Sequence, residues 1–164
     1  MSYMAGVLTA SDKGSRGERE DESGRVIREI LSELGIEVRE YRVVPDERDV
    51  IADVLREWSE RLDLIVTTGG TGLGPRDVTP DATREVIDRE IPGMADEMRR
   101  VSIAKTPHGM LSRALCGARG KTLIINLPGS PRAVRECLDA VKAALPHALE
   151  VLQGRAAECA RLRG

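Results

Sequence analysis

Short apolar runs alternate along the chain with segments whose hydrophobic residues recur every three or four positions. The runs at 5–11, 36–44, 62–68 and 122–128 predict β-strands. Segment 36–44 alternates apolar and polar residues, which is typical of a half-buried strand near a sheet edge. Strands that alternate with helical segments predict an α/β fold around a mostly parallel sheet, and we expect residues 1–164 to form a single domain.

The helical segments carry recognisable start and stop signals. Apolar residues line one face of a first helix from Val26 to Leu34 and of a second from Val50 to Trp58. The Thr-Pro pair at 79–80 and the Ser-Pro pair at 130–131 each resemble an N-cap followed by a first-turn proline. Pro146 should kink or break the closing helix, because proline lacks the N–H that a helix interior needs.

Two regions follow neither pattern clearly, and a helix boundary lies between them. Residues 12–21 form a polar loop after the first strand. Pro92 should end one helix and begin another that runs to residue 105. Residues 106–121 contain three glycines and no clear period, so we expect a loop with short strand pieces.

Two glycine-rich segments, TTGGTG at 67–72 and LPGSP at 127–131, each follow a predicted strand and precede a predicted helix. In open α/β sheets this edge holds the ligand crevice, so we expect both segments to face one pocket. Glycine lets backbone N–H groups approach an anion, and threonine adds uncharged donors, so the first segment suits phosphate. It is neither a Walker loop nor a GxGxxG motif. The alternative is a tight strand-to-helix turn.

Three aspartates lie close to these segments in the predicted fold. Asp46 has the position of an N-cap of the second helix, and Asp81 is explained by the first turn of the third. Asp77 has no such explanation, because Thr79 already supplies the cap. A carboxylate held beside a phosphate-binding loop needs a cation, which implies Mg²⁺.

The composition limits the classes of partner. A formal net charge of −2 and an aromatic content of 2% argue against nucleic-acid binding. Most of the 25 basic residues are arginines; Arg76 and Arg113 could bind phosphate oxygens, although either alone is more often exposed surface. The three cysteines have no CxxC spacing, and the chain shows no signal-peptide pattern or membrane-spanning apolar run. We therefore expect a cytoplasmic protein with no membrane segment.

The segments TTGGTGLGPRDVTPDAT, IPGMADEMR, TPHGMLSRALCGARGKTLIINLPGSP and ALPHALEVLQG resemble the molybdenum-cofactor biosynthesis family. This family includes MogA-type molybdopterin adenylyltransferases, MoaB proteins and the gephyrin G-domain. The resemblance runs from LTASDKGSRGEREDESG to about residue 154.

The MoaB branch shares the fold and the GGTG loop, but RDVTPDAT and NLPGSP resemble the adenylyltransferase branch more closely. The resemblance implies a doubly wound α/β domain that forms a homotrimer, with TPHGMLSR as a candidate subunit contact. It implies transfer of AMP from Mg-ATP to the terminal phosphate of molybdopterin, with release of pyrophosphate. ATP and molybdopterin are then the substrates, Mg²⁺ is the cofactor, and a downstream metal-insertion enzyme is a further partner.

The same resemblance assigns roles to individual positions. Asp46 in PDE and Asp77 in RDVTP match the family carboxylates that matter for activity, and they would hold Mg²⁺. One residue can both cap a helix and bind a cation, so this match extends the capping role of Asp46. Matching positions for nucleotide or substrate binding are Ser11, Asp12, Thr68, Gly69, Gly70, Thr71, Gly72, Arg76, Ser112, Asn126, Pro128 and Gly129.

Two other functions remain open from the sequence. The first is a non-catalytic, MoaB-like protein that binds molybdopterin. The second is a different nucleotide-dependent transferase, such as the related domain of larger fused proteins. Pyrophosphate release that depends on both ATP and molybdopterin separates these functions from the adenylyltransferase.

Overall fold

A mixed β-sheet forms the centre of the computed structural model, which describes residues 2–155. Its six strands have the order β2-β1-β3-β6-β5-β4. They are β1 (Met4–Ala10), β2 (Glu37–Val44), β3 (Leu64–Thr68), β4 (Arg89–Glu90), β5 (Cys116–Arg119) and β6 (Thr122–Leu127). Strands β2, β1, β3 and β6 run parallel, whereas β5 is antiparallel to both neighbours. The mostly parallel sheet is confirmed, with an antiparallel edge that the sequence did not predict.

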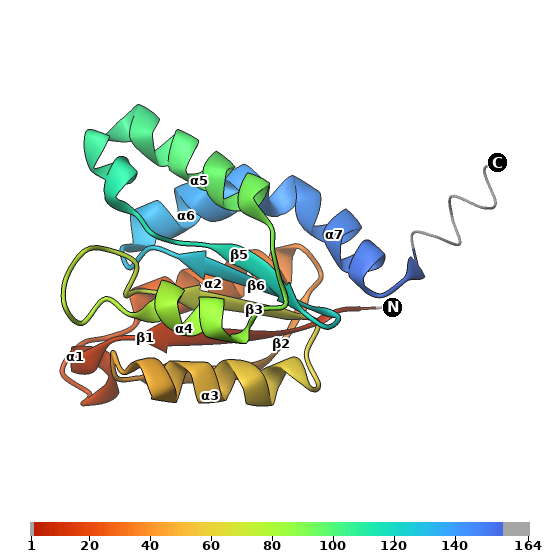
Figure 1. Cartoon of the computed structure of the whole chain (residues 1–164), viewed down its shortest axis with the longest axis horizontal. Coiled ribbons are helices and arrows are strands. Elements are labelled where there is room, and N and C mark those ends of the chain that lie inside the picture. Colours follow the sequence, from red (N-terminus) through yellow and green to blue (C-terminus); the bar gives the residue numbers. More distant parts are fainter. Residues whose placement is uncertain (1, 156–164) are drawn as a thin grey trace.

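Helices cover both faces of the sheet (Figure 1). They are α1 (Asp12–Ser15), α2 (Glu22–Glu33), α3 (Arg48–Ser59), α4 (Thr79–Val86), α5 (Pro92–Lys105), α6 (Pro131–Val141) and α7 (Leu145–Leu152), with 3₁₀ segments η1 (Pro107–Leu111) and η2 (Lys142–Ala144). Helices α2, α5, α6 and α7 pack on one face, and α3 and α4 pack on the other. Within residues 2–155, no helix is long and apolar enough to cross a membrane.

Two apolar cores hold these layers together. Val7 and Leu8 are neighbours on β1, yet Val7 packs in the core with α2 and α6 while Leu8 packs in the core with α3 and α4. Trp58 of α3 is fully buried against Gly6, where a Cβ would lie 2.6 Å from the indole ring. Because both faces are covered, the central strands are nearly continuous apolar runs, and the loops at their ends rest on a rigid base.

Two expected helix caps are wrong. Helix α4 begins at Thr79 itself, its N-cap is Val78, and no side chain caps it. The N-cap of α3 is Glu47, so Asp46 lies outside the helix, and its carboxylate accepts the backbone N–H of Asp12 instead. For Asp46, a tertiary hydrogen bond thus outweighs the local capping preference.

Other local predictions are confirmed. Ser130 caps α6, because its hydroxyl oxygen accepts the N–H of Ala133 at 3.2 Å. The closing helix is interrupted by η2, and α7 restarts with Pro146 in its first turn, where the missing N–H costs nothing. The irregular region at 106–121 holds β5, a short strand of the kind expected there, and the 3₁₀ segment η1, which the sequence did not predict. Residues 12–21 contain the short helix α1, which the sequence did not predict.

Candidate active site

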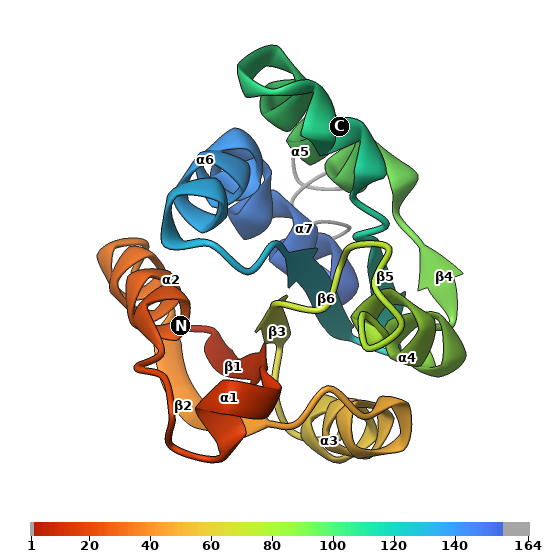
Figure 2. The same cartoon turned by 90° about the vertical axis from the view of Figure 1, so that its left-hand side faces the viewer.

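The loops that follow the parallel strands gather at one edge of the sheet, which Figure 2 shows end-on. They surround a cleft of about 660 Å³. The residues of this cleft that the sequence predicted are Ser11, Asp46, Thr68, Gly69, Gly70, Asp77 and Gly129. Residues from both glycine-rich loops therefore line one cleft, as the sequence predicts.

Backbone rather than side chains forms the part of the cleft between β1 and β6. Gly69 has a φ of +91°, and a Cβ there would collide with the carbonyl oxygen of Ala10 at the end of β1. Gly69 donates its N–H to Leu127 at 3.2 Å, which ties the loop to β6. The next three N–H groups, from Gly70 to Gly72, have no hydrogen-bond partner within residues 2–155. Successive unpaired N–H groups are the arrangement that binds phosphate oxygens.

The Asp77 carboxylate lies inside the same loop. Its Oδ2 accepts the N–H of Gly74 at 2.9 Å. A Cβ on Gly72 or on Gly74 would lie 2.9 Å from this oxygen. The two glycines therefore leave the space that the carboxylate occupies, and the loop sequence fixes where this charge sits.

Asp46 and Asp12 bind each other across the loops that follow β2 and β1. Asp46 Oδ2 accepts the N–H of Asp12 at 3.0 Å, and Asp12 Oδ1 accepts the N–H of Asp46 at 3.0 Å. Arg76 donates from Nε and Nη2 to the two carboxylate oxygens of Asp12, at 3.1 and 2.8 Å. Asp12 and Arg76 thus join three loops, and neither lines the cleft in this structure. Their direct contact with a substrate stays a prediction.

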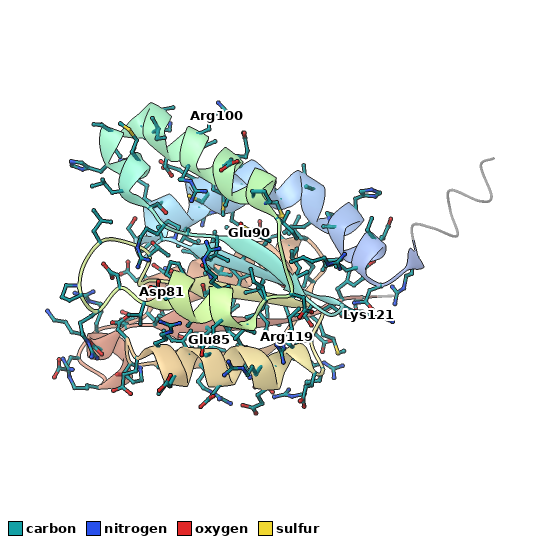
Figure 3. The ribbon with its side chains drawn as sticks, viewed as in Figure 1. Asp81, Glu85, Glu90, Arg100, Arg119 and Lys121 are labelled. Carbon is teal, nitrogen blue, oxygen red and sulfur yellow. The ribbon has the colours of Figure 1, made fainter. Side chains whose placement is uncertain are left out.

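Arg113 supports the glycine loop and the segment that follows it. Its Nε donates to the carbonyl oxygen of Gly72 at 2.9 Å, and its Nη2 donates to that of Asp77 at 2.6 Å. The guanidinium also pairs with the carboxylate of Asp81 at 3.1 Å. Asp81, labelled in Figure 3, lies in the first turn of α4. Arg113 is therefore neither free surface nor a free phosphate ligand.

The carboxylates near the cleft differ in their pKa values. Burial raises the pKa of Asp46; the N–H of Asp12 opposes this rise, and the negative charges of Asp12 and Asp77 add to it. Hydrogen bonds from Arg76, and then from the N–H of Asp46, lower the pKa of Asp12. Arg113 similarly lowers the pKa of Asp81 through its hydrogen bonds. A cation beside Asp46 would favour the ionised form that burial disfavours.

Thr79 adds a feature that sequence reasoning missed. Its side chain is fully buried, and its Oγ1 has no hydrogen-bond partner within the described part of the chain. The point where a Cβ on Gly70 would lie is 2.5 Å from this oxygen and 3.4 Å from Asp46 Oδ1. The hydroxyl and the carboxylate thus lie beside the same turn of the glycine loop. The sequence assigned Thr79 to helix capping, and that assignment hid its place at the site.

A second, smaller pocket of about 280 Å³ is lined by five further predicted residues, from the glycine loops and from segments beside them. These are Thr71, Gly72, Ser112, Asn126 and Pro128. Side chains of α5, η1 and α6 form most of its wall, including the apolar residues Met98 and Leu111. Because Gly69 and Gly70 line the larger cleft while Thr71 and Gly72 line the pocket, the GGTG loop stands between the two. The single pocket expected for all these residues is therefore two neighbouring ones.

The amide group of Asn126 is engaged within the protein. The residue is fully buried, and its Nδ2 donates to the hydroxyls of Thr67 and Thr83 at 3.0 Å each. Its Oδ1 accepts the N–H of Leu115 at 3.2 Å. These bonds connect β6 with β3 and α4, so Asn126 supports the loops from behind. Substrate binding by its side chain stays a prediction.

The start of α2 supplies a wall of the cleft that the sequence did not reveal. Residues 19–23 line it, and Asp21 accepts hydrogen bonds from Thr9 Oγ1 at 2.6 Å and from the Tyr41 hydroxyl. Ser23 Oγ donates to the carbonyl oxygen of Gly129 at 2.7 Å, which ties α2 to the LPGSP loop. Nothing local marks residues 19–23, because only the folded sheet brings them opposite the glycine loops.

The fold and the cleft define the class of protein: an α/β fold whose strand-end loops form a backbone-lined, acidic site. Residues 6–147 match the family model described as a probable molybdopterin binding domain, and the chain belongs to this family. The resemblance seen in the sequence is thereby confirmed.

Individual relatives agree with the family match. Molybdopterin adenylyltransferase of Helicobacter pylori strain J99 is 46% identical over 153 residues, which cover 91% of this chain and 87% of that protein. The structure of the molybdopterin biosynthesis enzyme MoaB from Thermus thermophilus is 56% identical with a TM-score of 0.87, covering 93% of this chain and 97% of that one. For the Mog protein of Mycobacterium ulcerans, the identity is 40%, the TM-score 0.88, and the coverage 94% and 99%.

Proposed function

We propose that this protein is a molybdopterin adenylyltransferase: it transfers AMP from Mg-ATP to the terminal phosphate of molybdopterin and releases pyrophosphate. One observation carries the proposal. Two glycine-rich loops and the two carboxylates of Asp46 and Asp77 line a single cleft of about 660 Å³. The name of the Helicobacter pylori relative, at 46% identity, supports the same activity.

The donor atoms of the cleft fit Mg²⁺. Carboxylate oxygens are ligands that Mg²⁺ prefers, and Asp46 and Asp77 supply them from two different loops. Burial disfavours the charge on Asp46, and the hydroxyl of Thr79 beside it lacks a protein partner. Asp46 and Asp77 would hold the cation, which when bound supplies positive charge to the phosphates. The described residues contain no cluster of three or more His, Cys, Asp or Glu side chains arranged to hold a metal by themselves. We therefore infer that phosphate oxygens complete the coordination.

The chemistry requires alignment and charge neutralisation from the protein. A terminal phosphate oxygen of molybdopterin attacks the α-phosphorus of ATP, the bond from that phosphorus to the bridging oxygen breaks, and pyrophosphate leaves. The attacking phosphate is already ionised at neutral pH, so no side chain has to remove a proton. The unpaired N–H group of Gly70, which lines the cleft, would hold a phosphate oxygen in line for this transfer.

The smaller pocket extends the site beyond the phosphates. Its wall is mostly apolar, although Arg99, Lys105 and Glu136 also line it, and such a wall suits a ring system. The pocket shares the GGTG loop with the cleft. We infer that the ring of one substrate lies there while its phosphate lies in the cleft.

Assembly and location stay predictions of this proposal. We infer a cytoplasmic homotrimer of single-domain chains that passes its product to a downstream metal-insertion enzyme. Leu73, Met110 and Leu111 have exposed fractions of 66%, 62% and 50%, which supports a subunit contact near η1.

Pyrophosphate release by the purified protein tests the proposed activity. The assay compares ATP with Mg²⁺ in the presence and absence of molybdopterin. Release that requires molybdopterin supports the adenylyltransferase. Binding of molybdopterin without release would instead support the MoaB-like binding protein, and release without molybdopterin would support a different nucleotide-dependent transferase.

A further inference from the structure

The wall of the cleft carries far more negative than positive charge. Five acidic residues line it, namely Glu20, Asp21, Glu22, Asp46 and Asp77. Among the lining residues that the structure describes, Arg19 is the sole basic side chain. Both substrates of the proposed reaction carry phosphate groups, so a cleft of this kind needs positive charge placed where the phosphates lie.

The arginines that the sequence singled out are already engaged. Arg76 binds the carboxylate of Asp12, and Arg113 binds two loop carbonyl oxygens together with Asp81. Using either one for phosphate would require it to give up these bonds. Neither guanidinium is among the groups that line the cleft.

Arg19 differs from these arginines and from its neighbour Arg16. Arg16 lies in the same loop and donates to both carboxylate oxygens of Glu18, at 3.2 and 3.0 Å. Arg19 makes no hydrogen bond or ion pair with any residue from 2 to 155. An unpaired guanidinium has five donors in a planar fork that matches two phosphate oxygens.

The surroundings of Arg19 favour binding of a phosphate group over an ion pair with a carboxylate of the protein. The carboxylate of Asp21 accepts hydrogen bonds from the hydroxyls of Thr9 and Tyr41 and from the N–H of Gly24, and the last of these caps α2. Asp21 therefore leaves Arg19 unpaired. The bond from Ser23 to Gly129 joins this side of the cleft to the LPGSP loop. Phosphate oxygens that enter between α2 and the LPGSP loop would therefore meet an arginine without a competing protein partner.

We propose that Arg19 is the phosphate-binding arginine of this cleft and that Arg76 is a positioning residue, which holds the Asp46 and Asp77 loops together through Asp12. The assignment of Arg19 rests on the proposed function, because it presumes that substrate phosphates occupy the cleft. It replaces the sequence-based assignment of Arg76 as a direct phosphate ligand.

Calorimetric titration with inorganic pyrophosphate and Mg²⁺ tests this assignment without relying on turnover. Arg19→Gln should raise the Kd for Mg-pyrophosphate about tenfold, as expected when one charge-assisted phosphate contact is lost. Arg16→Gln removes the same charge from the same loop and should leave the Kd unchanged. Arg19→Lys should lie between wild type and Arg19→Gln, because it keeps the charge and loses the fork. Thermal unfolding of each variant shows that the fold is retained.

The outcomes separate this inference from the proposed function. A wild-type protein that does not bind Mg-pyrophosphate would contradict the proposed function. Wild-type binding with an unchanged Kd for Arg19→Gln would overturn the role of Arg19 alone. Equal losses of affinity in Arg19→Gln and Arg16→Gln would show that only net charge matters. That result would also overturn the role of Arg19.

Discussion

The polar cleft and the apolar pocket share the GGTG loop, yet different chemical groups line them. The cleft is formed by loop backbone and by carboxylates that follow separate strands, and most of its lining is polar. The pocket is formed by side chains of α5, η1 and α6, and its lining is mostly apolar. Consecutive residues of one loop face opposite sides, so the loop can align a phosphate on one side with a ring on the other. Charge changes in the cleft and shape changes in the pocket should therefore have separable effects.

Removing one carboxylate from the cleft should have the largest effect. Asp77→Asn should lower turnover about 100-fold or more, because it removes electrostatic stabilisation where charge is transferred. Its thermal stability should stay near wild type, since the amide oxygen can still accept the N–H of Gly74. Asp53→Asn, on the exposed face of α3, is the control. Near-normal turnover in Asp77→Asn, measured as pyrophosphate release, would remove this carboxylate from the mechanism.

Displacing the same carboxylate without changing its charge should have a smaller effect. In Gly72→Ala, the new Cβ would lie 2.9 Å from Asp77 Oδ2 and push it aside. We expect a loss of about tenfold in kcat/KM, close to 1.4 kcal/mol, with a stability change of about 1 kcal/mol or less. Gly93→Ala is the matched control, because its added Cβ meets no atom within 4 Å apart from its chain neighbours and the backbone of its own helix. Equal kinetics for the two variants would show that the position of the Asp77 carboxylate does not matter.

Narrowing the pocket should affect a different quantity. Ala133→Leu adds side-chain volume to the wall of the 280 Å³ pocket. We expect the KM of one substrate to rise about tenfold, at the lower end of the range that one methylene group contributes to specificity. The Kd for Mg-pyrophosphate should not change, because that ligand has no ring. A raised Kd for Mg-pyrophosphate would show that the two sites are not separate.

The smallest effect concerns stability and its dependence on pH. Burial raises the pKa of Asp46, so its ionised form destabilises the folded state at neutral pH. Asp46→Asn should therefore raise the Tm at pH 7 by roughly 1–3 °C, a size that corresponds to under 1 kcal/mol in a protein of this length.

The sign of this effect fixes how it varies with pH. Asp46 takes up its proton at a higher pH in the folded protein than in the unfolded chain. The increase in Tm of Asp46→Asn over wild type should therefore shrink as the pH falls through the raised pKa. Cation binding by wild type should weaken over the same range. Thermal unfolding of both proteins between pH 7 and 4 measures the difference in Tm. A difference that grows as the pH falls would contradict the raised pKa of Asp46.

The sequence predicts the parts of this molecule that depend on local pattern. Buried strands such as Leu64–Thr68 begin with an unbroken apolar run. The Ser130 cap and the break before Pro146 follow from short-range hydrogen bonding. The edge strand β4 escaped prediction because it has two residues. A short strand was expected in the region of β5, but that region has no clear period to fix the bounds or direction of the strand.

The site residues were harder to interpret because their partners are distant in sequence. Asp46 matched a helix cap, yet its carboxylate binds Asp12, which lies 34 residues away. Arg76 and Arg113 were candidates for phosphate binding, but each meets an acidic partner that only the fold brings near. Sequence reasoning thus found the loops that form the cleft, whereas the pairing of their charges required the tertiary structure.

A crystal structure of the protein with Mg²⁺ and a non-hydrolysable ATP analogue tests the central claim most directly. The account predicts a phosphate oxygen against the N–H group of Gly70 in the cleft, with the cation beside Asp46 and Asp77. A nucleotide whose phosphates lie outside this cleft, with neither carboxylate near the cation, would contradict it.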